Sequence, residues 1–159
     1  PRAIGIGIRT GELTIGEMGS VGRSDYTIIG DNVNLASRLD GLTNIYGAAI
    51  IISSQTQSQL TLECQTRSLD IVKVKGKEEA VEIFEVLQPA NGISQDEMHR
   101  YKRALAFYRT KKIEEALAAF ESLQQNFASP LYELYIKRCQ YAIDVGIDTF
   151  DTVTTMHTK

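Results

Sequence analysis

The sequence predicts an α+β fold in which a mixed sheet domain is followed by a purely helical region. Three observations support this prediction. Before residue 88, alternating and β-branched runs surround one long helical pattern; "QPANGIS" then breaks the chain at residues 88–94; and only helical periodicity follows, to about residue 144. We therefore expect a sheet domain at residues 1–88, a helical module at 94–144 and an irregular tail at 145–159.

The first strand pattern lies at the amino end. Isoleucines alternate with Gly5 and Gly7, and a second short run at residues 13–16 follows the turn-like stretch at residues 10–12. This spacing predicts a hairpin within residues 3–19. Because glycines inside a strand mark a place where another element approaches closely, we expect such an approach at Gly5 and Gly7.

A long helix is predicted at residues 32–46, where apolar residues recur at steps of four, three and four: Leu35, Leu39, Leu42 and Tyr46. Asp31 is expected to cap its amino end, and Gly47 is expected to end it. The rest of the sheet pattern comprises "AAIIIS", a short helix at residues 54 to about 60, and two strands, "SLDIVKVKG" and "AVEIFEVL", which residues 75–79 connect.

The helical module carries two apolar stripes and a third helix that starts at Ser129-Pro130, with serine as the cap and proline at the first position. The stretch "ALAFYRTKKIEEALAAFESL" resembles one tetratricopeptide unit, with Phe107, Ala116 and Phe120 near its small and aromatic positions. A single repeat cannot build a solenoid. Two interpretations stay open: a helical hairpin that completes the core, or a surface that binds a protein partner.

The composition argues against several classes of function. A net charge of −3 disfavours a nucleic-acid partner, which usually requires a basic face. No apolar run approaches the ~20 residues that span a bilayer, and the amino end lacks the layout of a signal peptide. The few cysteines and histidines lack zinc-site spacing: Cys64, Cys139, His99 and His157. We expect a cytoplasmic chain and, because it begins directly in a strand, a piece of a longer protein.

The stretch "SDYTIIGDNVNLASRLDGL" places many polar groups at the start of a helix that must pack. Asn34 and Arg38 are four residues apart, so they share one helix face. An amide and a forked guanidinium on one face could bind a ribose and a phosphate together. The alternative is a surface ion pair of Arg38 with an acidic residue, with Asn34 belonging to the cap.

The surrounding sequence favours the interpretation in which Asn34 and Arg38 bind a ribose and a phosphate. The segments "GIGIRTGE", "GSVGRSDYTIIGDNVNLASRLDGLTNIYG", "IIIS", "LDIVKVKGK" and "VEIFEVL" closely resemble, in order and spacing, the carboxyl-terminal half of the class III adenylate and guanylate cyclase catalytic domain. The resemblance covers residues 3–87 and implies a partial ferredoxin-like cyclase sheet domain. The helical tail after it is similar to that of bacterial cyclases with a sensor and membrane helices upstream. It implies a cytoplasmic domain of a membrane-anchored parent.

The resemblance also implies roles for five residues. Asn34 would hold the ribose of ATP, and Arg38 would stabilise the phosphoryl group as the 3'-hydroxyl attacks the α-phosphate and pyrophosphate leaves. Thr27 matches the position that reads the purine, in the form typical of adenylate cyclases. Lys75 matches the lysine that contacts the terminal phosphates, and Lys77 is a second candidate. A solvated turn remains the alternative for both lysines.

Asp25 and Asp31 invite interpretation as metal ligands, but Asp31 is better explained as a cap and Asp25 matches no metal position of the family. We therefore expect no metal ligand in this chain. The family uses two Mg²⁺ or Mn²⁺ ions, whose aspartates would lie upstream. Its sites form between two domains of a dimer, so we expect this chain to hold one side of each site and to be inactive alone.

Three other interpretations compete with this one. The GxG of "GIGIRTGE" lacks the third glycine and the following helix of a dinucleotide site, so strand glycines explain it better. A guanylate cyclase would share most of these residues, with Thr27 as the discriminator. A catalytically dead cyclase-like module that regulates or binds a partner remains the alternative from a different class.

Overall fold

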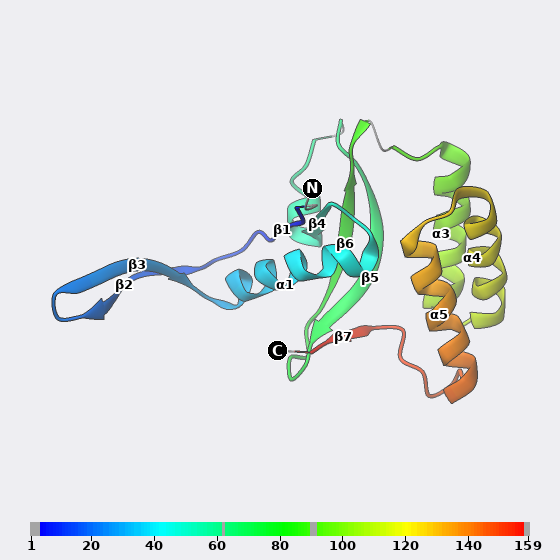
Figure 1. Cartoon of the computed structure of the whole chain (residues 1–159). Helices are drawn as coiled ribbons and strands as arrows, with labels where there is room; N and C mark the ends of the chain where they lie inside the picture. The colour runs from blue at the N-terminus through cyan, green and yellow to red at the C-terminus, as the bar shows by residue number, and fades with distance from the viewer. Residues whose placement is uncertain (1–3, 62, 90–91, 158–159) are drawn as a thin grey trace.

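The computed structural model describes residues 4–61, 63–89 and 92–157, and for residues 18, 20 and 23–29 it describes the backbone only. Figure 1 shows the elements in chain order, which are β1 (Ile6–Ile8), β2 (Thr14–Ser20), β3 (Arg23–Ile29), α1 (Asp31–Tyr46), β4 (Ile50–Ser53), α2 (Ser54–Gln57), β5 (Gln65–Val74), β6 (Ala80–Leu87), α3 (Gln95–Arg109), α4 (Ile113–Phe127), α5 (Pro130–Val145) and β7 (Thr154–Met156). A mixed sheet with a helix precedes three helices, which confirms the predicted α+β class.

The main sheet has the strand order β1-β4-β6-β5-β7. Strand β1 is parallel to β4, β6 is antiparallel to both of its neighbours, and β7 is parallel to β5. The predicted hairpin within residues 3–19 is wrong. Strand β2 pairs with β3 instead, across a two-residue turn in which Gly22 has a φ of 92°, a value that glycine adopts readily. Polar residues in β3 interrupt the apolar pattern that indicates a strand, so β3 was not predicted.

Helix α1 packs closely on β1, as the strand glycines predicted. A Cβ atom on Gly7 would lie 2.3 Å from the backbone nitrogen of Asp40, so only glycine permits this approach. Gly47 ends the helix in the left-handed conformation, which confirms the predicted stop. The predicted cap at Asp31 is wrong by one residue: Gly30 occupies the cap position, and Asp31 is the first helical residue.

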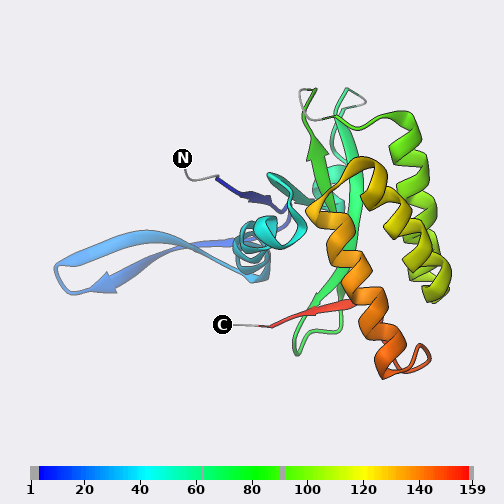
Figure 2. The ribbon, with the colours of Figure 1, turned by 45° about the vertical axis from the view of Figure 1, so that its right-hand side comes forward.

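Helices α3, α4 and α5 pack against one another beside β5 and β6 (Figure 2). Ser94 and Ser129 cap α3 and α5 by accepting from the backbone N–H groups of Glu97 and Leu131, so the predicted third helix start is confirmed. Aromatic residues fill much of the shared core: Tyr46, Tyr101, Tyr108, Phe120, Tyr132 and Tyr135. No helix in the described ranges is long and apolar enough to cross a bilayer.

The tail differs from the irregular segment that we expected. Thr154–Met156 forms β7, which pairs with β5 from Val72 to Val74. Met156 is buried and Phe150 packs on the core, where its ring meets those of Tyr108 and Tyr141 edge-on. The pairing depends on the free edge of β5, which no local pattern in residues 145–159 could reveal.

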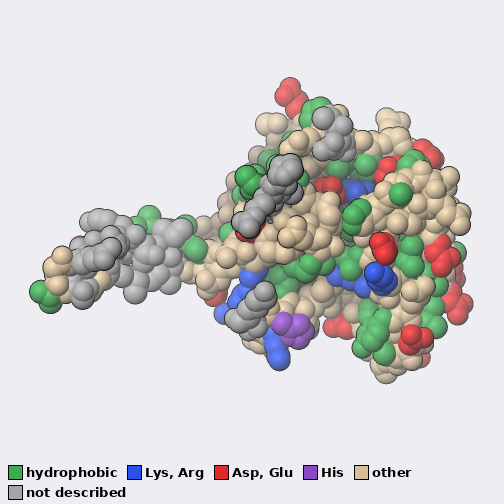
Figure 3. Space-filling model, viewed as in Figure 1, with side chains coloured by type: hydrophobic (Ala, Val, Ile, Leu, Met, Phe, Trp, Pro, Cys, Tyr) green, Lys and Arg blue, Asp and Glu red, His purple; other side chains and the backbone are tan. Residues whose placement is uncertain are grey.

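Strands β2 and β3 form an arm that projects from the rest of the molecule (Figures 1 and 3). Its described apolar side chains lie largely in solvent: Leu13, Ile15 and Val21. Among the described elements, the main contact of the arm with the body is where β3 leads into α1. An isolated two-stranded hairpin is marginally stable in water, so this arm is suited to packing against another surface.

Candidate functional site

A pocket of about 210 Å³ opens between the first turns of α1 and the ends of β5 and β6. It is lined by four basic residues, three acidic residues, one amide and an apolar floor: Arg9, Arg38, Lys73, Lys77, Asp31, Glu78, Glu79, Asn32, Leu35, Val72, Val74, Val81 and Met156. A second hollow of about 560 Å³ lies between α1 and β7, and Arg38 and Met156 line both. Arg38 therefore stands at the centre of this concave surface.

The Arg38 guanidinium is half-buried and, among the described residues, has no hydrogen-bond or ion-pair partner. Buried or half-buried guanidinium groups are normally paired, because their donors lose water without compensation otherwise. The predicted alternative, an ion pair of Arg38 with an acidic residue, is therefore not observed within the described part of the chain. A free fork of donors in a pocket rich in cations can accept a phosphate or carboxylate.

Asn34 lies one turn before Arg38 but is exposed and does not line either hollow. Its side-chain amide has no partner among the described residues, and its backbone N–H donates to the carbonyl of Gly30 at 3.1 Å. Thus the amide has no partner in the described ranges, as a ligand-binding group would, but it lies outside the lining of both hollows. A second surface would have to meet it.

The two predicted lysines differ in their surroundings. Lys77 lines the pocket and pairs with Asp31 at 3.2 Å, an exposed contact that a stronger anion could displace. Lys75 is exposed in the β5–β6 turn and lies outside the pocket lining, and its backbone N–H donates to the carbonyl of Met156 at 2.9 Å. The structure therefore brings Lys77, and not Lys75, into the pocket with Arg38.

Thr27 and Asp25 lie in β3, and their side chains are outside the described part of the structure. Their backbones place them on the arm, opposite Gly16 and Met18 respectively. The prediction for Thr27 as the purine-reading residue therefore stays a prediction.

Two pocket residues were missed at the sequence level. Arg9 Nε donates to Asn32 Oδ1 at 2.9 Å, and Asn32 Nδ2 donates to the carbonyl of Glu12 at 2.7 Å. These bonds tie the exit of β1 to the first turn of α1. A Cβ atom on Gly11 would lie 2.3 Å from the Asn32 amide, so this glycine makes room for it. The predicted elements put Arg9 next to a turn and Asn32 at the start of a helix, but no sequence pattern indicates that these two side chains meet.

The residues present do not fit a divalent metal ion. Within residues 4–61, 63–89 and 92–157, no group of three or more histidine, cysteine or acidic residues could hold one. Asp31, the acidic residue of α1 that lines the pocket with Arg38, is paired with Lys77. A Mg²⁺ site requires several carboxylate or carbonyl oxygens around one point.

Buried charges elsewhere are fully paired. Arg67 donates to Glu85 at 2.8 Å and to the Tyr132 hydroxyl at 2.8 Å, and it stacks on the ring of Tyr101 at 4.7 Å. Burial alone would lower the pKa of Arg67, but the Glu85 carboxylate together with Tyr132 and Tyr101 outweighs this effect, so the pKa is raised. Burial also raises the pKa of the Cys139 thiol to about 12, so this cysteine is unreactive at neutral pH.

Comparison with known proteins agrees with the sequence resemblance. The chain is 45% identical over 87 residues to an adenylate cyclase of Anabaena cylindrica, covering 53% of this chain and 17% of the relative. It is 35% identical over 146 residues to the terminal-differentiation specific adenylate cyclase of Dictyostelium discoideum, covering 85% of this chain and 7% of the relative. Among solved structures, the adenylyl cyclase CyaB from P. aeruginosa is 37% identical, with a TM-score of 0.45 over 55% of this chain and 44% of that chain.

The chain thus spans less than a fifth of the length of either curated relative. Residues 2–87, which are more than half of the chain, match the family described as the adenylate and guanylate cyclase catalytic domain. The chain therefore belongs to the adenylate and guanylate cyclase family, through this catalytic-domain segment.

Proposed function

We propose that this chain is part of an adenylate cyclase that converts ATP to 3',5'-cyclic AMP and pyrophosphate. The observation that carries the proposal is the half-buried guanidinium of Arg38, which has no partner among the described residues, in a pocket that also holds Arg9, Lys73 and Lys77. The relatives named adenylate cyclase support the choice of substrate. The basic residues outnumber Asp31, Glu78 and Glu79 in the lining, and their donors can attract a triphosphate and stabilise charge on a phosphoryl group.

In the proposed reaction, the ribose 3'-hydroxyl of ATP attacks the α-phosphorus, and the bond from that phosphorus to the bridging oxygen of the leaving pyrophosphate breaks. Arg38 would donate to the α-phosphoryl oxygens as negative charge shifts through the transition state. Asn34 would hold the ribose, and Thr27 would read the adenine. Lys75 and Lys77 would contact the terminal phosphates, with Lys77 leaving Asp31 to do so.

The family's two Mg²⁺ or Mn²⁺ ions would offset phosphate charge when bound. Since the described residues do not form a metal site, we propose that the carboxylate ligands come from polypeptide outside this chain. This chain alone would then bind nucleotide weakly and would not turn it over.

We also propose that the site is completed by a second cyclase domain in a homodimer. Asn34 is exposed outside the pocket lining with no partner among the described residues, and the arm exposes Leu13, Ile15 and Val21. Both features are suited to a partner surface that covers the exposed amide and the apolar side chains of the arm. A surface of the helical region for a further protein partner remains a secondary proposal.

The test uses a longer polypeptide that contains this chain and extends through the whole catalytic domain. Arg38→Ala should lower the rate of cyclic AMP formation by about 10²–10³, because removal of one donor to the transition state has an effect of that size. Its melting temperature should stay unchanged, since Arg38 has no partner to lose within the described part of the chain. Arg103→Ala, an exposed arginine on α3, is the matched control and should retain full activity.

Normal turnover in Arg38→Ala would overturn the assignment. Turnover of GTP in preference to ATP would identify a guanylate cyclase. If the folded longer polypeptide makes neither cyclic nucleotide, the regulatory, non-catalytic interpretation replaces the proposal.

A further inference from the structure

A β-bulge in β5 turns a carboxylate into the core. The β5–β6 register shifts between Ser68 and Asp70, so Leu69 has no partner residue in β6. The consecutive residues Leu69 and Asp70 are both buried at the bulge, and Asp70 is only 2% exposed. A buried carboxylate is tolerated only when it is paired and hydrogen-bonded.

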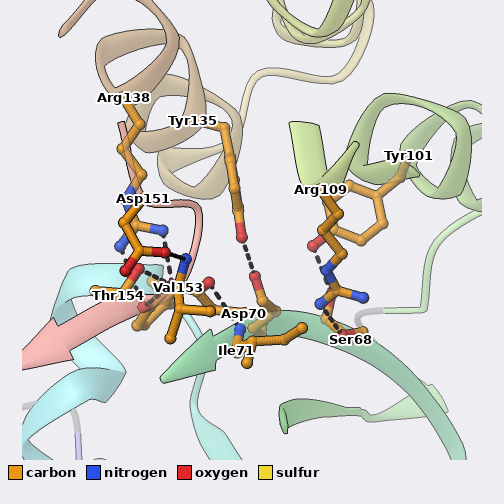
Figure 4. A network of polar contacts seen from close by, with 12 residues as sticks. Ser68, Asp70, Ile71, Tyr101, Arg109, Tyr135, Arg138, Asp151, Val153 and Thr154 are labelled. Atoms are coloured by element: carbon orange, nitrogen blue, oxygen red, sulfur yellow. Dashed lines mark hydrogen bonds and ion pairs between the residues drawn. The ribbon is translucent and has the colours of Figure 1, made fainter. Parts of the chain in front are cut away.

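Asp70 is held by groups from four segments of the chain (Figure 4). Its Oδ2 atom accepts from Tyr46 of α1 at 2.5 Å, from Arg138 of α5 at 2.7 Å and from Thr154 of β7 at 2.7 Å. Its Oδ1 atom accepts from the backbone N–H of Ile71 at 2.7 Å. We call Tyr46, Asp70, Arg138 and Thr154 the Asp70 cluster.

Arg138 spans the cluster. One terminal nitrogen of its guanidinium donates to Asp70, and the other donates to the Tyr46 hydroxyl at 3.2 Å. The guanidinium carbon, Cζ, lies 5.4 Å from the ring centre of Tyr46 and 5.2 Å from that of Tyr135. Lysine could not reproduce this fork, because its ammonium is a single point of charge. Arg138 therefore fastens the carboxyl-terminal end of α1 to the helical region.

The Asp70 cluster joins α1, β5 and β7, and these elements also line the two hollows that contain Arg38. Helix α1 carries Arg38 two turns before Tyr46, and both residues line the hollow of about 560 Å³. Strand β7 carries Met156, which lines both hollows, and its carbonyl accepts from the backbone of Lys75. A shift of α1 or β7 at the cluster would therefore move the walls around Arg38.

The helical region also holds β5 directly. The Tyr101 hydroxyl donates to the carbonyl of Ser68 at 2.5 Å, and the Tyr135 hydroxyl donates to that of Leu69. The match to the Dictyostelium relative covers 85% of this chain, more than residues 2–87 can supply, so it includes part of the helical region. Both observations indicate that sheet and helices form one unit.

We propose that Arg138 is a positioning residue of the cyclase site: through Asp70 and Tyr46, the helical region fixes α1 and β7 and thereby sets the position of Arg38. The effect on catalysis rests on the proposed function. The mechanical part of the proposal, that the helical region fixes α1 and β7, concerns this chain alone. Arg138 touches neither the reacting atoms nor the pocket of about 210 Å³.

Hydrogen–deuterium exchange on this chain tests the mechanical part. In Arg138→Met, the rate of amide exchange at residues 39–46 and 154–156 should rise by about tenfold more than the rate in α4. The reason is that the contacts that close a segment determine how often it opens locally. Arg138→Lys should lie between Arg138→Met and the parent sequence, and Arg103→Met should change nothing. Should Arg138→Met not fold, Tyr46→Phe and Thr154→Val, which remove one hydroxyl each, should show the same local pattern. Uniform change across all helices, or none at residues 39–46, would overturn the proposal.

Steady-state kinetics in the longer, active polypeptide test the catalytic part. Tyr46→Phe should lower kcat about tenfold with KM for ATP nearly unchanged, because a misplaced transition-state donor acts on the chemical step. Unchanged kcat with raised exchange would show a purely structural cluster and overturn the positioning role. Absence of activity in the parent sequence itself would overturn the proposed function, while the exchange result would still decide whether the helical region fixes α1.

Discussion

The body of the molecule, where β5 packs on α3 and α5, and the pocket side of α1 differ in how their polar side chains are paired. In the body, buried charges such as Arg67 and Asp70 have several partners each, and no described buried side-chain nitrogen or oxygen is left without one. On the pocket side, Arg38 and Asn34 have none among the described residues. The first arrangement holds a fold together, whereas the second leaves donors available to a ligand.

The same comparison explains why the amino acid type alone does not separate structure from function. Arg38 and Arg138 line the same hollow, yet only Arg138 is bound to a buried carboxylate. Burial lowers and Asp70 raises the pKa of Arg138, and the net effect is a raised pKa, so its charge is permanent. Partners, rather than residue type, distinguish the two arginines.

The largest effect on folding is expected from removing the carboxylate of the cluster. Asp70→Ala should lower the free energy of unfolding by about 3–5 kcal/mol, because it leaves Arg138 buried without its counter-charge. Asp31→Ala removes an equally charged residue from an exposed pair and should change stability by about 0.5 kcal/mol or less. Urea unfolding followed by circular dichroism measures both. Equal effects would contradict the distinction between body and pocket side.

A smaller effect is expected where α1 meets β1. Gly7→Ala should destabilise by about 1–3 kcal/mol, because the new Cβ atom would collide with the backbone of Asp40 and Ala36. Gly41→Ala, on the same helix, meets nothing within 4 Å and should stabilise by about 0.5–1 kcal/mol. Thermal unfolding of the two variants gives the comparison, and a loss of stability in Gly41→Ala would show that α1 is not seated as described.

How far the sequence could predict the molecule depended on the range of the interactions. Helix α1, its end at Gly47 and the serine cap of α5 follow from residues close in sequence, and all were predicted. The pairing of β1 with β4 and the strand β7 depend on partners more than 40 residues away, and these were missed. Local periodicity carries no information on which free edge a strand will reach.

The candidate site shows the same division. Arg38 was identified from a motif that lies within one helix, and the structure places it in a cationic pocket. The link from Asp70 to Arg138 spans 68 residues and depends on a bulge, so no spacing rule could have found it. Lys77 was ranked below Lys75, although only Lys77 lines the pocket, because the turn's geometry was unknown from sequence.

The smallest effect on folding, and the sharpest contrast with the body, is expected at the arm. Ile15 is 68% exposed, so Ile15→Glu should change the free energy of unfolding by about 0.5 kcal/mol or less. If the arm packs on a second copy, the same change should weaken self-association about tenfold, because a charge would enter an apolar contact. Ile143→Glu alters a half-exposed isoleucine on α5 and is the matched control. Sedimentation velocity at several concentrations distinguishes them: weakening by Ile15→Glu alone places the contact on the arm, whereas equal weakening, or a monomer at all concentrations, contradicts it.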